Sequence, residues 1–419
     1  MPGQNRLRRS RQVARLTRRG WFLVVLGAIA LPASYWLGRR ELLYLGCFIL
    51  LLPLFALAFV RWRRMSLSVE RTFSPPAVGA GHPSVVDVQI RTLLPTSILD
   101  VYWRDSLPWA PYSTNLTRLP GRSTTLNLRY EVVPPSRGIF EIGPMLVDFS
   151  DPFGLADGAR TVGRPQRLIV TPDVVQLTDD AVAISADEGS SRVVKRRALS
   201  GEDDLMTREY RRGDAIRRVH WRASAHHGEL MVRQEEQRSH AEARIVFDTR
   251  RGNYRDASGT PRRGDVESRS FEWVVAFVAS LGLHLQRSGV LVQVIETGAA
   301  QLADIDRPEE FLESLAAVGL VDAPPVPLSL LRSAERPDRS QGSIIAVLSD
   351  ADSDTLERLI TQRRSFDLAV AFLVGPSRPE LAESLDSAGW LCIDVNPDAP
   401  VELAWMALGA SQEGSRGRA

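Results

Sequence analysis

From Trp21 to Val60 the chain reads WFLVVLGAIALPASYWLGRRELLYLGCFILLLPLFALAFV. The part up to Gly38 and the part from Leu42 onward contain no charged residue, and only the tripeptide Arg-Arg-Glu at 39–41 separates them. Each part is long enough to cross the roughly 30 Å hydrocarbon layer of a membrane as a helix. The stretch therefore predicts a transmembrane helical hairpin with two spans.

Aromatic residues near the ends of both apolar runs support this interpretation. Trp21, Tyr35, Trp36 and Tyr44 lie where amphipathic rings prefer the membrane–water interface. A cleaved signal peptide is the alternative for the first run. That run is long for a signal sequence, no small-x-small cleavage site follows it, and the second run comes directly after it. We therefore favour a permanent anchor in the lipid bilayer.

Arginine residues set the expected orientation of the anchor. Seven precede the first span, two lie in the turn and three follow the second span. The positive-inside rule then places both flanks in the cytoplasm, with 1–20 as a basic N-terminus and both chain termini cytoplasmic. The expected location is a cell membrane crossed twice. The N-terminal arginines can also attract anionic lipid headgroups, at about 1 kcal/mol each.

Length and composition limit the rest of the chain. Its 419 residues can hold two domains beside the membrane element. The net charge of +2 provides no general attraction to nucleic acid, and two cysteines exclude a disulfide framework.

Residues 65–175 predict a β-sandwich-like domain. Apolar and polar residues alternate in segments such as Leu67–Phe73, Val85–Ile90 and Leu126–Val132, and Pro- and Gly-containing breaks separate them. This pattern is typical of short antiparallel strands. The DPFGL sequence at 151–155 is interpreted as a turn, because Asp precedes Pro and Gly follows. We expect the domain to act as a scaffold or spacer.

Residues 241–410 predict an α/β domain. The strand Ala243–Phe247 is followed by alternating helices and apolar strands up to Trp390–Val395. Such alternation indicates crossover connections and a mainly parallel sheet. The polar tail 411–419 is expected to be disordered.

Two carboxylates of this domain are candidate metal ligands. Asp248 and Asp350 each follow a predicted strand, and ligands of such sheets bind at the carboxyl ends of strands. Carboxylates suit a hard cation such as Mg²⁺. The alternative is that these residues, with Asp352 and Asp354, only form turns and helix caps.

Between the two domains, the segment 176–240 is rich in arginine. Its centre, 201–236, reads GEDDLMTREYRRGDAIRRVHWRASAHHGELMVRQEE. Arginines that stack on aromatic rings and bind carboxylates need this mixture of residues. The segment predicts either a partly buried ion-pair network, with Tyr210 and Trp221 largely buried, or a docking surface. The residues selected for this role are Arg208, Glu209, Tyr210, Arg212, Gly213, Asp214, Arg217, Arg218, His220, Trp221, Arg222, Glu229 and Arg233.

Enzymatic and nucleic-acid functions are disfavoured. The chain has no G-x-x-x-x-G-K-[ST], H-E-x-x-H or G-x-S-x-G sequence. His220, His226, His227 and His240 cluster, but neighbouring arginines would repel zinc, so we expect them to form hydrogen bonds. Acidic residues interleave with the arginines and argue against a phosphate-binding surface.

Three stretches resemble one bacterial family, the domain of unknown function 58. They are PSRGIFEIGPMLVDFSDPFGL at 135–155, REYRRGDAIRRVHWRASAHHGELMVR at 208–233, and the strand that ends at Asp248. The resemblance implies a membrane hairpin, a β domain, the arginine-rich signature and a von Willebrand A-like α/β domain. It also implies two protein partners, a MoxR-type AAA+ ATPase and a transglutaminase-like membrane protein.

Von Willebrand A-like domains often carry a metal site that begins Asp-x-Ser-x-Ser. Here Asp248 is present, but Arg250 and Gly252 stand where the serines belong, while Asp350 fits the later Asp. We expect the guanidinium of Arg250 to occupy the cation position or to pair with Asp248. The predicted cofactor is therefore none, with Mg²⁺ as the alternative.

The expected function is that of a non-enzymatic, membrane-anchored adaptor or binding protein. Its cytoplasmic domains would recognise protein partners, including the MoxR-type ATPase, in the assembly or remodelling of envelope complexes. A structural membrane component without an ATPase partner is one alternative, and a metal-dependent enzyme is the other.

Overall fold

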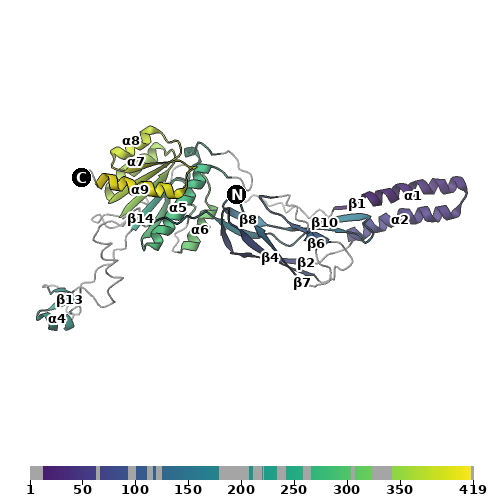
Figure 1. Ribbon diagram of the computed structural model, residues 1–419, viewed down its shortest axis with the longest axis horizontal. Coiled ribbons are helices and arrows are strands. Elements are labelled where there is room, and N and C mark those ends of the chain that lie inside the picture. Colours follow the sequence, from purple (N-terminus) through teal and green to yellow (C-terminus); the bar gives the residue numbers. More distant parts are fainter. Residues whose placement is uncertain are drawn as a thin grey trace. The chain divides into compact units, whose positions relative to one another are not determined.

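The computed structural model describes residues 13–62, 67–92, 101–110, 117–118, 125–178, 207–210, 219, 221–233, 242–257, 266–302, 307–322 and 342–416. The chain divides into two compact units, Met1–Asp173 with Pro261–Val266, and Val174–Thr260 with Glu267–Ala419. The first contains two apolar helices and a β-rich domain, and the second contains an α/β domain with a parallel sheet (Figure 1).

The two apolar helices are α1 (Arg18–Leu37) and α2 (Arg40–Trp62). Both are long and apolar enough to cross a membrane, as the sequence predicts. Gly38 ends α1 with a φ of 64°, a left-handed conformation that glycine adopts at little cost. Figure 1 shows the helices side by side, projecting from the end of the β domain that carries β1 (Val13–Leu16) and β10 (Ala156–Val162).

Small residues bring the two helices together. Gly27 of α1 and Gly46 of α2 are buried where the two helices meet. A Cβ placed on Gly27 would lie 3.1 Å from Cβ of Leu50, so the glycine sets how closely the helices approach. Inside lipid, where no hydrophobic effect drives helix association, such small residues permit close van der Waals packing.

The residues before α1 belong to the β domain. Strand β1 pairs antiparallel with β10, with Val13 opposite Ala159 and Leu16 opposite Ala156. The sequence predicted only a basic N-terminus for residues 1–20. The strand β1 corrects that prediction. Strand β2 (Leu67–Ser74) follows α2 in the same unit. The β domain therefore holds the start of α1 and the end of α2.

The DPFGL turn, confirmed as a turn, is organised by a buried carboxylate. Asp151 accepts backbone N–H groups from Phe153 (2.9 Å), Leu155 (2.6 Å) and Ala156 (2.6 Å). These bonds satisfy the carboxylate and order the loop between β9 (Met145–Ser150) and β10.

The ordered DPFGL loop binds the residue that precedes α1. The backbone N–H of Thr17 donates to the carbonyl of Leu155 (2.9 Å), and its hydroxyl donates to the carbonyl of Gly154 (2.7 Å). The same hydroxyl accepts from the N–H of Gly20 (3.1 Å) and caps the helix. A Cβ on Gly20 would collide with the carbonyl of Leu155.

The end of α2 is held by β10. Arg160 donates from Nη2 to the carbonyl of Arg61 (3.2 Å) near the helix C-terminus. A Cβ on Gly158 would lie 2.6 Å from Cγ1 of Val60 and 2.8 Å from Cζ of Phe149. The strand can therefore touch the helix only because position 158 has no side chain.

Replacing Gly158 by leucine should separate α2 from β10. Overpacking a contact of this kind costs about 1–3 kcal/mol. We expect trypsin to cleave after Arg61 faster in Gly158→Leu than in the wild-type chain in detergent. Thr161→Leu, at an exposed position of the same strand, is the control and should leave the rate unchanged. Equal rates for both variants would refute the contact.

The β domain contains three sheets around one core. Their strand orders are β1-β10-β9-β5-β6, β3-β11-β8 and β2-β4-β7. The remaining strands are β3 (Ala77–Gly79), β4 (Ser84–Thr92), β5 (Val101–Asp105), β6 (Thr117–Arg118), β7 (Thr125–Val132), β8 (Gly138–Ile142) and β11 (Gln166–Thr171). Alternate residues of β4 are buried, as its period-two pattern predicts. One pair, β3 with β11, is parallel rather than antiparallel.

A buried ion pair lies in this domain. Arg71 donates from Nε and Nη2 to the two carboxylate oxygens of Asp105 (2.8 and 2.6 Å), and both side chains are almost fully buried. The hydroxyl of Tyr130 also donates to Asp105 (2.6 Å). Burial and the adjacent carboxylate raise the pKa of Tyr130, which keeps its hydroxyl a donor.

Removing Asp105 should destabilise the first unit strongly. Asp105→Ala leaves a buried guanidinium without its partner, which costs about 3–5 kcal/mol. We expect a lower denaturation midpoint for the full chain in detergent. Asp87→Ala removes an exposed ion pair with Arg129 on the same domain and should leave the midpoint unchanged. Similar midpoints for the two variants would contradict the role of the buried pair.

The second unit contains a five-stranded parallel sheet with the order β15-β14-β16-β17-β18. The strands are β14 (Glu242–Phe247), β15 (Leu291–Glu296), β16 (Ser343–Leu348), β17 (Leu368–Val374) and β18 (Leu391–Val395). For β14 and β18 the predicted ranges, Ala243–Phe247 and Trp390–Val395, differ from these by one residue at the start. Their near-continuous apolar sequences are typical of strands covered on both faces.

Helices cover the two faces of this sheet (Figure 1). One core includes side chains of α5 (Arg269–Arg287), α6 (Pro308–Ala317) and α9 (Val401–Arg416). The other includes α7 (Ser353–Gln362) and α8 (Pro379–Ser387). Strand β15, which follows β14 in the chain, lies on one side of β14 within the sheet. The later strands β16, β17 and β18 lie on its other side. The carboxyl ends of β14 and β16 therefore form the topological switch point, where ligands of such sheets bind.

Two segments outside the predicted domain belong to this unit. Val175 donates its N–H to Ser280 Oγ (3.1 Å), and the indole of Trp405 donates to the carbonyl of Thr178 (2.9 Å). At the other end, α9 continues to Arg416. The polar tail expected from residue 411 is therefore helical at first, because the exposed turns of a packed helix tolerate polar residues.

Candidate functional site

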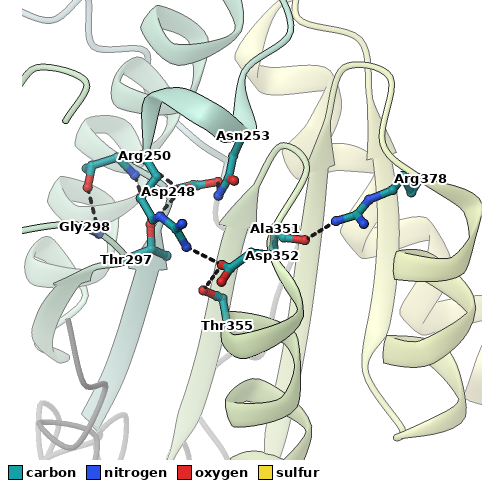
Figure 2. A network of polar contacts seen from close by, with 10 residues as sticks. Asp248, Arg250, Asn253, Thr297, Gly298, Ala351, Asp352, Thr355 and Arg378 are labelled. Carbon is teal, nitrogen blue, oxygen red and sulfur yellow. Dashed lines mark hydrogen bonds and ion pairs between the residues drawn. The ribbon is translucent and has the colours of Figure 1, made fainter. Parts of the chain in front are cut away.

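Asp248 lies directly after β14, at the switch point (Figure 2). Its side chain is fully buried, and three groups of the chain donate to it. They are the hydroxyl of Thr297 (2.6 Å), the amide of Asn253 (2.8 Å) and the backbone N–H of Arg250 (3.1 Å). Both carboxylate oxygens are thereby occupied.

The charge state of Asp248 reflects two opposed effects. Complete burial raises its pKa overall, and the bonds from Thr297, Asn253 and the Arg250 N–H offset only part of that rise. Tyr254 donates its hydroxyl to the backbone carbonyl of the same residue (2.6 Å). Asp248 therefore acts as a buried acceptor that fixes the loops after β14 and β15.

The guanidinium of Arg250 lies beside this carboxylate but binds another one. Its Nη1 forms an ion pair with Oδ1 of Asp352 (2.5 Å), which also accepts the hydroxyl of Thr355 (2.6 Å). Burial acts to raise the pKa of Asp352, but these two bonds outweigh it and lower the pKa. The expected direct pairing of the Arg250 side chain with Asp248 is thus corrected: only the Arg250 backbone donates to Asp248.

Asp350 has a different environment. Arg378 donates from Nε to its Oδ1 (2.7 Å), and Arg255 donates from Nη2 to its Oδ2 (3.3 Å). Burial acts to raise the pKa of Asp350, and the two guanidinium groups lower it overall. A second bond joins Arg378 Nη2 to the carbonyl of Ala351 (2.7 Å). Asp350 therefore binds two arginines, Arg378 and Arg255, at the carboxyl edge of the sheet.

This arrangement does not fit a divalent cation. The oxygens of Asp248 accept from the chain itself, and those of Asp350 face two arginines. Positive guanidinium groups oppose the binding of Mg²⁺. Within the residues that the structure describes, His, Cys, Asp and Glu form no group of three that could hold a metal.

Sequence reasoning missed several members of this site. Asn253, Thr297 and Arg378 come from three separate loops, and no local motif marks them. Only the rule that strand ends converge at the switch point could have suggested Thr297, which directly follows β15. Asp352 directly precedes α7, at the position of the helix-cap alternative, but its side chain makes no capping bond and instead pairs with Arg250.

Asp248→Asn should lower the stability of the α/β domain. The substitution replaces one carboxylate oxygen by an NH₂ group, which donates. This group would face one of the donors that now bind Asp248. Leaving a buried polar group unsatisfied costs about 1–3 kcal/mol. We expect a lower thermal midpoint for the full chain in detergent, whereas Asp354→Asn at an exposed position should have no effect. An unchanged midpoint for Asp248→Asn would contradict the assigned donors.

The arginine-rich signature forms a small structured segment of its own. Strand β12 (Thr207–Glu209) pairs antiparallel with β13 (Met231–Arg233), and the buried residues Val219 and Val232 form a bridge beside them. The helix α4 (Trp221–His227) contacts β13 through Ser224, whose Oγ accepts the N–H of Met231 (2.8 Å).

The burial expected for Trp221 is wrong. Its side chain is 68% exposed, and Leu230 nearby in sequence is 48% exposed, while Tyr210 is half-buried. The indole at the start of α4 therefore lies outside the small core that Val219 and Val232 form. Exposure of Trp221 favours the docking interpretation over a buried aromatic network.

The ion-pair network itself stays a prediction. The positions Arg212, Gly213, Asp214, Arg217, Arg218 and His220 lie outside the described residues. For Arg208, Glu209, Arg222 and Arg233 only the backbone is described, and Glu229 is exposed. Of the four clustered histidines, His226 lies on the exposed side of α4 and His227 ends the helix, while His240 is outside the described residues.

Solved structures provide little guidance. Similar chains include the CARDB domain of a Pyrococcus furiosus protein, at 13% identity over 23% of this chain and 88% of that chain, with a TM-score of 0.16. A Paenibacillus cycloisomaltooligosaccharide glucanotransferase matches at 13% identity over 79% of this chain and 53% of that one, with a TM-score of 0.19. A carbohydrate esterase matches at 8% identity over 84% and 98%, with a TM-score of 0.21. Likenesses this weak support no conclusion.

The family comparison is informative. No curated protein matches the chain. The model of the family described as "Protein of unknown function DUF58" matches residues 206–301. That range begins at β12, contains the signature segment with Trp221, and continues through Asp248 and β15 to Gln301. Over this range the chain is therefore similar to the DUF58 family.

Proposed function

We propose that this protein is a membrane-anchored, non-enzymatic adaptor whose cytoplasmic domains recognise protein partners. The proposed partner is a MoxR-type AAA+ ATPase, in the assembly or remodelling of envelope complexes. The observation that carries the proposal is the exposure of Trp221 within the signature segment of the family.

An exposed tryptophan is unusual unless something covers it. Burying a large apolar side chain contributes roughly 1.5–3 kcal/mol, and tryptophan is enriched among the residues that dominate protein interfaces. Trp221 and Leu230 both expose about half or more of their surface, whereas Val219 and Val232 of the same segment are buried. We infer that the two apolar side chains form the centre of a partner contact.

The anchor supports the same proposal. The β domain holds the ends of both apolar helices, so when α1 and α2 cross a membrane both ends lie on one side. By the arginine counts this side is the cytoplasm. The signature segment would then face the cytoplasm and a partner there.

The switch point of the sheet supports a binding role. A five-stranded parallel sheet with helices on both faces is compatible with a von Willebrand A-like domain, which we retain as a proposal. Its carboxyl edge is filled by Arg250 with Asp352, and by Arg378 with Asp350. These ion pairs leave the carboxylates engaged, which disfavours the metal-dependent enzyme.

Affinity purification of the full-length protein from its own membranes, with and without ATP, tests this function. We expect an AAA+ ATPase to be recovered in an amount that depends on nucleotide. Trp221→Ala should reduce that recovery more than about tenfold, the effect of losing a residue worth roughly 2 kcal/mol. The thermal midpoint of this variant should not change, since the indole is exposed.

Met406→Ala is the matched control, because Met406 is an exposed apolar residue of α9 (51%) outside the signature segment. It should leave recovery unchanged. Recovery of envelope proteins without an ATPase would favour the structural membrane component. Full recovery with Trp221→Ala would refute the docking role of the tryptophan.

A further inference from the structure

The tip of the DPFGL turn exposes an aromatic side chain at one end of the helical pair. Phe153 is 69% exposed, and Pro152 beside it is also exposed. Nothing in the core of the β domain requires an aromatic residue here. The bonds of Asp151 and Thr17 order the loop without using the ring.

The turn lies at the level where α1 begins. Gly154 and Leu155 are bonded to Thr17, one residue before the helix starts. Trp21 follows four residues later, which corresponds to about 6 Å along a helix. Trp21 and the terminal Trp62 of α2 are 59% and 79% exposed, as expected for rings at a membrane interface. The loop is therefore beside the interface that these tryptophans mark.

Positive charge surrounds the same end. The side chains of Arg15, Arg18, Arg19 and Arg61 are exposed. Arg19 lies next to the turn, with Nη1 4.0 Å from the Cβ position of Gly154. The one acidic residue of the turn, Asp151, is buried and bonded to backbone N–H groups, so it presents no charge to lipid.

We propose that the turn 151–154 is a second membrane contact, in which Phe153 inserts among the lipid headgroups and the flanking arginines bind their phosphates. This rests on the proposed membrane anchorage of α1 and α2 and extends it to the β domain. Arginine is suited to phosphate, and an aromatic ring is favoured at the boundary between headgroups and acyl chains. The contact would hold the β domain against the bilayer instead of letting it tilt on the two helices.

Depth-dependent fluorescence quenching tests the proposal on the full-length chain in lipid vesicles. In a Cys47→Ser, Cys392→Ala background, a single cysteine at Phe153→Cys receives an environment-sensitive dye. We expect strong quenching by lipids that carry a spin label near the headgroup. Ile139→Cys, at a comparably exposed apolar position (47%) on β8 of another sheet, is the control and should be quenched several-fold less.

The native Cys47, which is exposed on α2, separates the two proposals. Labelled alone, it should be quenched by lipids with the spin label deep in the acyl chain. If Cys47 is quenched and position 153 is quenched no more than position 139, the loop contact is refuted while the anchor stands. If Cys47 is not quenched either, the anchor and the loop contact both fail.

Discussion

The first unit depends on the joint between the DPFGL turn and the start of α1. A buried carboxylate, Asp151, orders the turn through three backbone bonds, and the turn then binds Thr17. Polar backbone groups at a helix end need partners, and Thr17, which the turn holds, supplies one by accepting the N–H of Gly20. With β1 before α1 and Arg160 at the end of α2, the joint makes the helices an extension of the sheet rather than a flexible tether.

In the second unit the corresponding constraint is the crowded carboxyl edge of the sheet. Four strand ends and loops bring Asp248, Asp350 and Asp352 close to arginines, and each carboxylate is satisfied by groups of the chain. Such an edge is rigid and charged on its rim, but its central carboxylate is not accessible. The proposed partner contact therefore rests on the exposed Trp221 of the signature segment and not on this edge.

Much of the architecture could be predicted because its signals are local. The apolar runs of α1 and α2 require no knowledge of the rest of the chain, and neither do the period-two pattern of β4 or the apolar strands β14, β16 and β17. Strand β1 could not be found this way. The strand has only four residues and lies in a basic stretch of the sequence. These residues form a strand because they pair with β10, which lies more than a hundred residues later in the chain.

The sequence by itself determined the two apolar helices, the strands of the parallel sheet, the positions of Asp248 and Asp350 after strands, and the similarity of residues 206–301 to the DUF58 family. Only the tertiary structure decided what these residues touch. The side chain of Arg250 binds Asp352 rather than Asp248, Asn253 and Thr297 complete the buried site, and Trp221 is exposed rather than enclosed. Periodicity reports the face on which a residue lies. Its partners are set by the crossover connections, which bring distant loops to one edge of the sheet.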